Sequence, residues 1–337
     1  MADRHGKRWD AIYVAVVVPY KEDSYEVDYE AFRGLIRYFL QPKFVDAGGG
    51  IIVNPEAGEI FYLTHEEKKR LIEIAVEEAK GKVPLFTGIF DMTTENAARD
   101  AVVAKEAGVD GWFFIPPTGS GDITYAWNPE KYPEIWIDWT KAIDEAVDLP
   151  IIVHPTSGTS PFYGVGLPVG PTVKMCTEVP NIVGWKMTYS LQGYKAISEA
   201  LRSLDRHVGV FAAPADLFHE NLLNDQFDGT VSGAFCYAME PMIDHIEAWK
   251  RNDLAEARRI WNGGLKRLQD YVYSDYARLH IRYKIGAWLR GLVPSPFMRP
   301  PQPKPKKEEI LQMKSLLSGA GLDVISDRDI DRVMARL

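Results

Sequence analysis

A (β/α)8 barrel with a C-terminal helical extension is the fold that the sequence predicts, and three observations predict it. Eight short, almost continuously apolar runs alternate with longer amphipathic stretches over residues 1–240. Runs of this kind are typical of parallel strands covered on both faces, and their alternation with helices indicates repeated βα units. Beyond Glu240 the pattern becomes wholly helical. We therefore expect residues 1–240 to form the barrel and residues 241–337 to form a helical extension packed on it.

The apolar runs give the eight predicted strands in chain order. They cover residues 12–18, 50–54, 85–90, 111–115, 150–154, 182–187, 208–213 and 229–234. Helix boundaries come from capping residues: Thr64 and Glu67 form a capping box, Thr93 and Thr94 are placed to cap the next helix, and Gly108 is placed to end it. In the extension, the helical stretches are 246–250, 254–273, 276–292 and 308–319.

Composition and charge exclude several classes of protein. Charged residues make up 26% of the chain and hydrophobic residues 46%, as in an ordinary globular protein. With a formal net charge of -8, the protein lacks the broad positive field that nucleic-acid binding needs. There is no apolar run long enough for a membrane span and no apolar core of a signal peptide at the N-terminus. We therefore expect a cytoplasmic protein without nucleic-acid or membrane partners.

Metal and cofactor motifs are missing from the sequence. Cys176 and Cys236 lie in unrelated segments without a CxxC pair, and the seven histidines show no HxH or HExxH spacing. The glycine-rich segment 164–170 contains proline and does not follow a first strand, so it is not a dinucleotide fingerprint. We therefore expect neither a catalytic metal nor a cofactor.

The sixth predicted strand ends in a lysine. Active sites of this fold lie at the C-terminal ends of the strands, so a polar residue there is a candidate for catalysis. Strand alternation places Gly184 and Lys186 on one face and Trp185 on the other, which favours the barrel interior for the lysine. Burial there would lower the pKa of Lys186 and supply a free amine that attacks a carbonyl. A lysine that reaches the rim or pairs with an acid is the alternative.

The lysine segment, Asn-Ile-Val-Gly-Trp-Lys at 181–186, resembles the Schiff-base segment of the dihydrodipicolinate synthase / N-acetylneuraminate lyase superfamily. Further blocks resemble this family in order and spacing, namely Gly58-Glu59 with 63–67, and segments 107–111, 149–153, 227–232 and 252–258. The resemblance implies a class I lyase in which Lys186 forms an imine with a 2-oxo acid. It also implies a homotetramer or dimer.

The family's G-T-T-G-E segment, which holds the substrate carboxylate, is replaced here by Pro55-Glu56-Ala57-Gly58-Glu59. Both hydroxyls are lost and an acid stands in place of one, so either the carboxylate pocket has moved or the substrate lacks that carboxylate. Glu56 is expected to be a second acid-base group or a selector of substrate polarity. Asn54 and the main chain of Ala57 and Gly58 are the expected substrate contacts here.

The family's Y-N-x-P-G segment after the fifth strand reads His-Pro-Thr-Ser-Gly at 154–158. His154 replaces the tyrosine that relays protons, and a histidine titrates near neutrality, so it can take over this role. A histidine that is only hydrogen-bonded at a strand end is the alternative. The family's P-Y-Y reads Pro116-Pro117-Thr118, and the arginine of the synthases is missing, with Thr159 nearest. These losses argue against dihydrodipicolinate synthase activity itself.

Tyrosines in the strand-end loops are further candidates for substrate contacts. Tyr163 and Tyr189 are assigned to substrate binding, together with Ser232 in the block that resembles the eighth strand, and Tyr125 lies nearby. The resulting hypothesis is a lyase, an aldolase or dehydratase, whose Lys186 forms a Schiff base with a pyruvate derivative. The alternatives are a lyase or hydrolase for a carbonyl substrate without the 2-oxo acid group, and a catalytically silent barrel that binds a metabolite.

Overall fold

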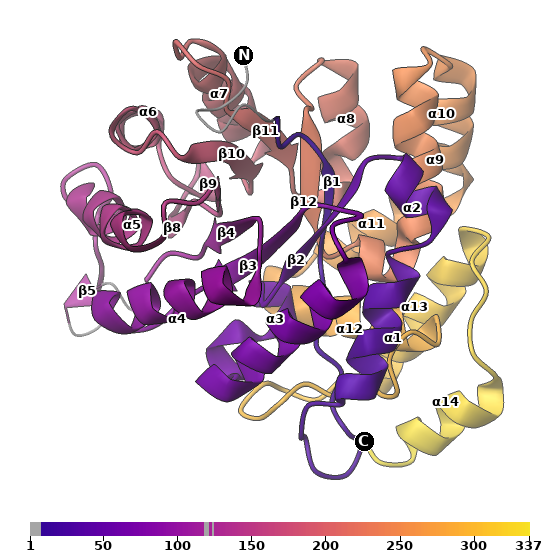
Figure 1. Cartoon of the computed structure of the whole chain (residues 1–337). Helices are drawn as coiled ribbons and strands as arrows, with labels where there is room; N and C mark the ends of the chain where they lie inside the picture. Colours follow the sequence, from indigo (N-terminus) through magenta and orange to yellow (C-terminus); the bar gives the residue numbers. More distant parts are fainter. Residues whose placement is uncertain (1–7, 118–120, 123–124) are drawn as a thin grey trace. The chain divides into compact units, whose positions relative to one another are not determined.

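Eight parallel strands close into a barrel in the computed structural model of the chain, which describes residues 8–117, 121–122 and 125–337 (Figure 1). Their order around the barrel is β1-β12-β11-β10-β7-β4-β3-β2. The strands are β1 (Ile12–Ala15), β2 (Gly49–Val53), β3 (Leu85–Ile89), β4 (Gly111–Phe114), β7 (Ile151–Val153), β10 (Ile182–Met187), β11 (Gly209–Ala212) and β12 (Gly229–Ser232). All eight predicted strands and the predicted (β/α)8 barrel are confirmed.

Chain contacts divide the protein into two compact units. Unit 1 comprises the chain up to Tyr13 together with Pro84–Val231, and unit 2 comprises Val14–Val83 together with Ser232–Leu337. The predicted boundary between residues 240 and 241 falls inside a helix, α9 (Phe235–Lys250). The division into a barrel and an extension stays a prediction.

Aromatic side chains fill one face of the strands in unit 1. Tyr13 on β1 lies 5.4 Å from Phe86 and 5.7 Å from Phe211, measured between ring centroids. Gly184 on β10 gives Phe211 its space, because a Cβ at this position would lie 2.2 Å from the Phe211 ring. Gly184 therefore points to the aromatic interior, as strand alternation predicts for it and for Lys186.

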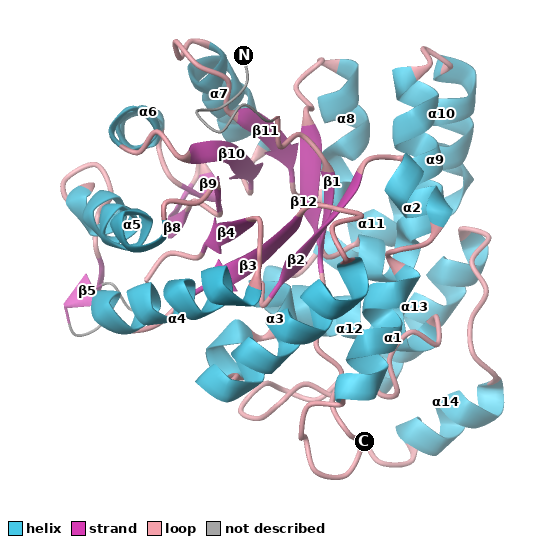
Figure 2. Ribbon diagram, viewed as in Figure 1, coloured by secondary structure: helices cyan, strands magenta, loops and turns pink. Residues whose placement is uncertain are grey.

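Helices cover the other face of these strands in unit 1, where α4, α5, α6 and α7 lie outside the strands (Figure 2). Trp112 and Phe114 on β4 contact Trp139 of α5, with ring centroids 6.2 and 5.2 Å apart. Thr93 caps α4 through the N–H of Asn96, and Gly108 ends it at a φ of 98°, both as predicted. The helices of this unit are α4 (Thr94–Ala107), α5 (Glu134–Val147), α6 (Val169–Glu178), α7 (Leu191–Arg202) and α8 (Phe218–Leu223).

Unit 2 is mainly helical, and its clearest boundary is the predicted capping box. Thr64 Oγ1 accepts the N–H of Glu67 at 3.2 Å, and Glu67 accepts the N–H of Thr64 at 2.9 Å. Across the described residues, no helix is both long and apolar enough to cross a membrane. The helices are α1 (Tyr29–Tyr38), α2 (Pro42–Asp46), α3 (His65–Ala79), α9, α10 (Leu254–Ile260), α11 (Lys266–Tyr273), α12 (Leu279–Leu289), α13 (Lys307–Gly319) and α14 (Asp327–Met334).

Two small antiparallel hairpins follow barrel strands of unit 1. The first joins β5 (Gly121–Asp122) to β6 (Tyr125–Ala126), and the second joins β8 (Thr156–Ser160) to β9 (Gly164–Gly166). The sequence predicted neither, because these polar, glycine-containing segments lack the apolar alternation of longer strands. Of the loop singled out after the fourth strand, Thr118, Gly119 and Ser120 lie outside the described residues.

Candidate active site

Lys186 lies near the C-terminal end of β10, on the face predicted for it. Its Nζ is 5.6 Å from the centroid of the Phe113 ring on β4, within the range of a cation–π contact. Trp185 points to the opposite side, where its Nε1 donates a hydrogen bond to the Tyr189 hydroxyl at 3.0 Å. One expectation needs correction, because Lys186 is only partly buried. It lies one residue before the end of β10, at the mouth of the barrel rather than in its closely packed interior.

His154 follows β7 directly and is buried, with 2% of its surface exposed. Its ring stacks on Phe113 with centroids 5.7 Å apart and an angle of 20° between the planes. Its backbone N–H donates to the Phe114 carbonyl at 3.0 Å, which continues the pairing between neighbouring strands. The structure therefore brings Lys186 and His154 to the same aromatic ring.

Tyr189 was expected to present its hydroxyl to a substrate, and the structure places it differently. The hydroxyl accepts from Trp185 and donates to the Leu167 carbonyl at 3.0 Å, on the opposite face of β10 from Lys186. Burial raises the pKa of Tyr189 well above its ordinary value. Tyr189 thus joins β10 to the chain that follows the β8–β9 hairpin, and we withdraw the expected substrate contact.

Tyr163 lies at the turn of the β8–β9 hairpin, partly exposed. Its ring packs on Phe162 with centroids 4.8 Å apart. Its position in a strand-end loop agrees with the sequence analysis. A role in substrate binding stays a prediction.

The second group of predicted site residues follows β2 in unit 2. Asn54 is buried at a φ of 52°, and its Nδ2 donates to the Lys68 carbonyl at 3.1 Å. Glu56, Ala57 and Gly58 form a 3-10 turn, in which the Gly58 N–H donates to the Pro55 carbonyl at 2.9 Å. The Gly58 N–H therefore serves the turn itself, which corrects the expectation that it holds anionic oxygens of a substrate.

Glu59, the last residue of this segment, received no role in the sequence analysis. It is buried at a φ of 58°, forms an ion pair with Lys284 of α12 and accepts the backbone N–H of Arg299 at 2.9 Å. Lys284 is also fully buried, 4.1 Å from the centroid of the Tyr20 ring. Burial lowers the pKa of Lys284, although the charge of Glu59 opposes this shift. These contacts make Glu59 an anchor for the helices of unit 2.

Ser232 ends β12 and begins a chain of buried hydroxyl groups. Its Oγ accepts the Ala234 N–H at 3.2 Å and lies 3.2 Å from the Tyr273 hydroxyl, which in turn lies 2.5 Å from the Tyr283 hydroxyl. Burial raises the pKa of Tyr283 well above its ordinary value. The sequence offered no signal for this series of hydroxyl groups, because they come from β12, α11 and α12.

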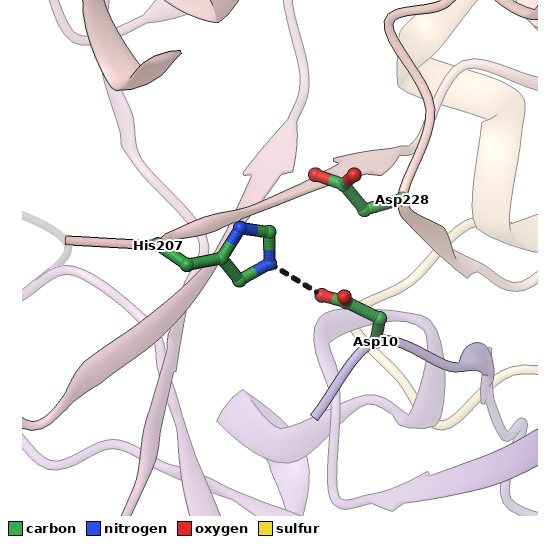
Figure 3. Close-up of side chains that lie close together, drawn as sticks. All are labelled: Asp10, His207 and Asp228. Carbon is green, nitrogen blue, oxygen red and sulfur yellow. Dashed lines mark hydrogen bonds and ion pairs between the residues drawn. The ribbon is translucent and has the colours of Figure 1, made fainter. Parts of the chain in front are cut away.

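Among the described residues of unit 1, one cluster of potential metal ligands is found, at the N-terminal ends of the strands. Asp10, His207 and Asp228 lie within two residues of the starts of β1, β11 and β12, with ligand atoms within 4.8 Å of one another (Figure 3). His207 and Arg8 contact Asp10 at 2.9 and 2.5 Å, and Arg202 contacts Asp228 at 2.6 Å. The guanidinium groups of Arg8 and Arg202 thus already neutralise the two carboxylates.

The pKa of Asp10 is consistent with this neutralisation. Burial raises it, but the hydrogen bond and charge of His207 and the charge of Arg8 outweigh burial and leave it below its usual value. In a (β/α)8 barrel, the N-terminal ends of the strands serve stability rather than catalysis. We interpret the cluster as an electrostatic clamp between β1, β11 and β12.

Comparison with known proteins agrees with this architecture. The family model of the dihydrodipicolinate synthetase family matches residues 8–320. An uncharacterised DapA-like lyase of Thermofilum pendens is 26% identical over 310 residues, which cover 91% of this chain and 96% of the relative. The crystal structure of dihydrodipicolinate synthase from Aquifex aeolicus superposes with a TM-score of 0.75 at 25% identity, over 94% of this chain and 99% of that chain.

A likeness in fold alone extends to a catalytic-lysine mutant of the sialic acid aldolase of Ruminococcus gnavus. Its TM-score is 0.74 at 20% identity, and the match covers 95% of this chain and 99% of the aldolase. The resemblance inferred from the lysine segment and its companion blocks is thereby confirmed, as is the prediction of a lyase. The chain belongs to the dihydrodipicolinate synthetase family.

Proposed function

We propose that the protein is a Schiff-base-forming lyase, an aldolase or dehydratase, for a 2-oxo acid such as a pyruvate derivative, and not dihydrodipicolinate synthase itself. The position of Lys186 is the single observation that carries the proposal. Its amine stands at the end of β10 beside Phe113, and His154 stacks on the same ring. An amine that attacks the carbonyl and a group that accepts and returns a proton are the two functions that imine chemistry requires.

In the proposed reaction, the neutral Nζ of Lys186 attacks the carbonyl carbon of the 2-oxo acid. The carbonyl oxygen leaves as water after it takes one proton from the amine and one from a general acid. The product is a protonated imine, whose positive nitrogen accepts electrons from the adjacent carbon. The face of the Phe113 ring, 5.6 Å from Nζ, favours this positive charge.

Bond cleavage follows from the imine. His154 takes the proton of a hydroxyl group on C4, the C3–C4 bond breaks, and its electron pair moves to the imine nitrogen. An aldehyde leaves, and an enamine remains on Lys186. His154 then returns the proton to C3, and water hydrolyses the imine to pyruvate and the free lysine. In a dehydratase, His154 takes a proton from C3 of the same imine and returns it to the C4 hydroxyl group, which leaves as water, and hydrolysis of the resulting unsaturated imine frees the lysine.

Glu56 supports a second candidate, the same chemistry on a carbonyl that lacks the 2-oxo acid group. Glu56 replaces a hydroxyl donor of the family segment, and the Gly58 N–H is used by the turn. A segment that offers a carboxylate and fewer donors is unfavourable for a substrate carboxylate. In this case Glu56 is the selector of substrate polarity. Asn54 and Ala57 stay predicted substrate contacts, and so does Ser232.

Deuterium exchange tests the proposal. Formation of the enamine makes the methyl protons of pyruvate exchange with D2O, which NMR follows directly. We expect exchange with the wild-type protein, none with Lys186→Ala, and slow exchange with His154→Ala. Lys195→Ala, which removes an exposed lysine of α7, is the matched control and keeps the wild-type rate. Exchange that survives in Lys186→Ala would contradict the role of this lysine.

A small-molecule carbonyl substrate and assembly into a homotetramer or dimer complete the proposal. Light scattering of the purified protein measures the assembly. If the protein is a monomer at micromolar concentration, the proposed oligomer is wrong, whereas the proposed chemistry of Lys186 is not affected.

A further inference from the structure

The last helix of the chain, α14, lies beyond the part that matches the family. The family model ends at residue 320, and α14 begins at Asp327. The helix has 8 residues, which is too short for a helix that is stable by itself in water. Ile330 and Val333 on its packed side are 2% and 0% exposed. The helix therefore forms where it docks, and its docking and folding are coupled.

α14 docks on the loop between β1 and α1, residues 20–27, which belongs to the same unit (Figure 1). Nη1 of Arg332 lies 2.9 and 2.8 Å from the two carboxylate oxygens of Glu22. Nη2 of Arg336, just after the helix, donates to the Glu22 carbonyl at 3.0 Å and to the Asp23 carboxylate at 3.1 Å. Two arginines of the C-terminal segment thus hold side-chain and main-chain oxygens of the β1–α1 loop.

Arg299 holds the β1–α1 loop at a second point. Its Nη2 donates to the Tyr25 carbonyl at 2.8 Å, and its guanidinium also pairs with Glu67 at 2.7 Å. Tyr25 has a φ of 57°, a left-handed conformation that a bulky residue keeps where its surroundings impose it. The loop is therefore held in a strained conformation by Arg299 and by the two arginines of the C-terminal segment.

The same contacts reach the turn that carries Glu56. Glu59 follows this turn, and its carboxylate accepts the Arg299 N–H at 2.9 Å. A Cβ on Gly58 would lie 2.8 Å from the Val16 carbonyl oxygen, so the turn lies directly against the chain that leaves β1. The loop and the turn follow the C-terminal ends of β1 and β2, and this end of a (β/α)8 barrel carries the active site. Movement of the loop therefore removes support from the predicted substrate contacts in the turn.

The contacts between α14 and the β1–α1 loop are open to solvent. The side chain of Arg332 is 54% exposed, and that of Glu22 is 22% exposed. Exposed ion pairs stabilise weakly, and salt screens them. A short helix that docks through such pairs and two apolar side chains is readily released.

We propose that α14 is a strap: when docked, it fixes the β1–α1 loop and, through that loop and Arg299, the turn that carries Glu56, and it thereby raises the affinity of the protein for its substrate. The inference rests on the proposed function and adds its regulation. Conditions that break the ion pairs, above all high salt, loosen the loop and weaken substrate binding, whereas the chemistry of Lys186 is unchanged.

Hydrogen exchange, measured by mass spectrometry on peptides that cover residues 20–28, tests the strap. We expect Arg332→Gln to accelerate exchange in the loop about two- to fivefold, as the loss of one exposed ion pair allows. Glu22→Gln has at least this effect, and adding Arg332→Gln to it changes nothing further, since the two side chains share one contact. Salt at about 0.5 M accelerates exchange in the wild-type protein more than in Arg332→Gln.

Arg328→Gln is the matched control. Arg328 lies on the same helix, is exposed, and forms no ion pair with any residue that the structure describes. Its loss is expected to leave exchange in the β1–α1 loop at the wild-type rate.

The kinetics of deuterium exchange into pyruvate test the effect on substrate affinity. Arg332→Gln is expected to raise KM for pyruvate about threefold or more and to leave kcat unchanged, since binding is weakened and no reacting group is lost. Arg328→Gln is expected to keep both wild-type values.

The two measurements separate this inference from the proposed function. Wild-type exchange of the loop in Arg332→Gln, or equal acceleration in Arg328→Gln, would overturn the strap. A faster loop combined with a wild-type KM would overturn its effect on substrate affinity. If the wild-type protein exchanges no proton of pyruvate, the proposed function and the effect on affinity fail together, whereas the protection of the loop still decides whether α14 holds it.

Discussion

The buried ion pair between Glu59 and Lys284 is the contact in unit 2 whose loss we expect to be most destabilising. Both side chains are 0% exposed. Lys284 also donates to the Phe297 carbonyl at 3.2 Å and lies over the Tyr20 ring, and the second oxygen of Glu59 accepts the Arg299 N–H at 2.9 Å. Lys284→Met keeps the volume of the side chain and leaves the Glu59 carboxylate buried without its counter-charge.

The magnitude follows from this geometry. Removal of one partner of a buried pair costs about 3–5 kcal/mol of unfolding free energy, because the remaining charge stays desolvated. Glu59→Gln is expected to cost less, since burial already lowers the pKa of Lys284 and the remaining lysine can lose its proton. In the double variant no charge is left uncompensated. The loss of unfolding free energy in the double variant should therefore be smaller than the sum of the losses in the two single variants by about 2 kcal/mol or more.

Urea unfolding of the wild-type protein, both single variants and the double variant measures these differences. Lys43→Met is the matched control, because the Lys43–Asp244 pair in the same unit is 39% and 46% exposed and should contribute about 1 kcal/mol or less. A loss below about 1 kcal/mol in Lys284→Met, or a double variant whose loss equals the sum, would refute the reasoning.

Three other perturbations have expected outcomes. Arg37 and Arg33 hold the pKa of Glu78 at about 2. The two ion pairs therefore stabilise the folded protein at pH values above the usual carboxylate pKa, and this stabilisation is lost as the pH falls toward 2. Glu78→Gln should therefore lower the unfolding free energy at neutral pH by about 1 kcal/mol or less, because its partner Arg37 is 62% exposed to solvent, and it should reduce the fall of the urea midpoint in acid. Gly184→Val places carbon atoms against Phe211 and should cost about 1–3 kcal/mol in the same assay, whereas no effect would contradict the packing of β10. Thr64→Ala removes the cap of α3 and should cost about 1 kcal/mol, and Thr64→Ser should restore most of it.

Much of the barrel could be predicted because its signals are local. A parallel strand covered on both faces is a continuous apolar run, so β10 and the other strands could be located from neighbouring residues alone. The capping box at Thr64 and the side of β10 that carries Lys186 are also local, since they depend on spacings of three and two residues. The apolar runs did not give the strand ends, because residues 16–18 are buried although β1 ends at Ala15.

The rest depends on partners far apart in the chain. Glu59 and Lys284 are 225 positions apart, and nothing near either residue indicates that they meet. The Tyr189 hydroxyl looked available for a substrate because the sequence does not reveal that the chain after the β8–β9 hairpin brings the Leu167 carbonyl to it. The partial exposure of Lys186 was missed for a similar reason, because alternation gives the face of a strand but not the depth of a side chain.

Reductive trapping tests the central claim most directly. The protein is incubated with pyruvate and sodium borohydride, and intact and peptide mass spectrometry locate the reduced adduct, with Lys186→Ala as comparison. We predict one adduct on the peptide that contains Lys186 and none in Lys186→Ala. No adduct with pyruvate or any other carbonyl compound, or an adduct that persists in Lys186→Ala, would contradict the proposed lysine imine.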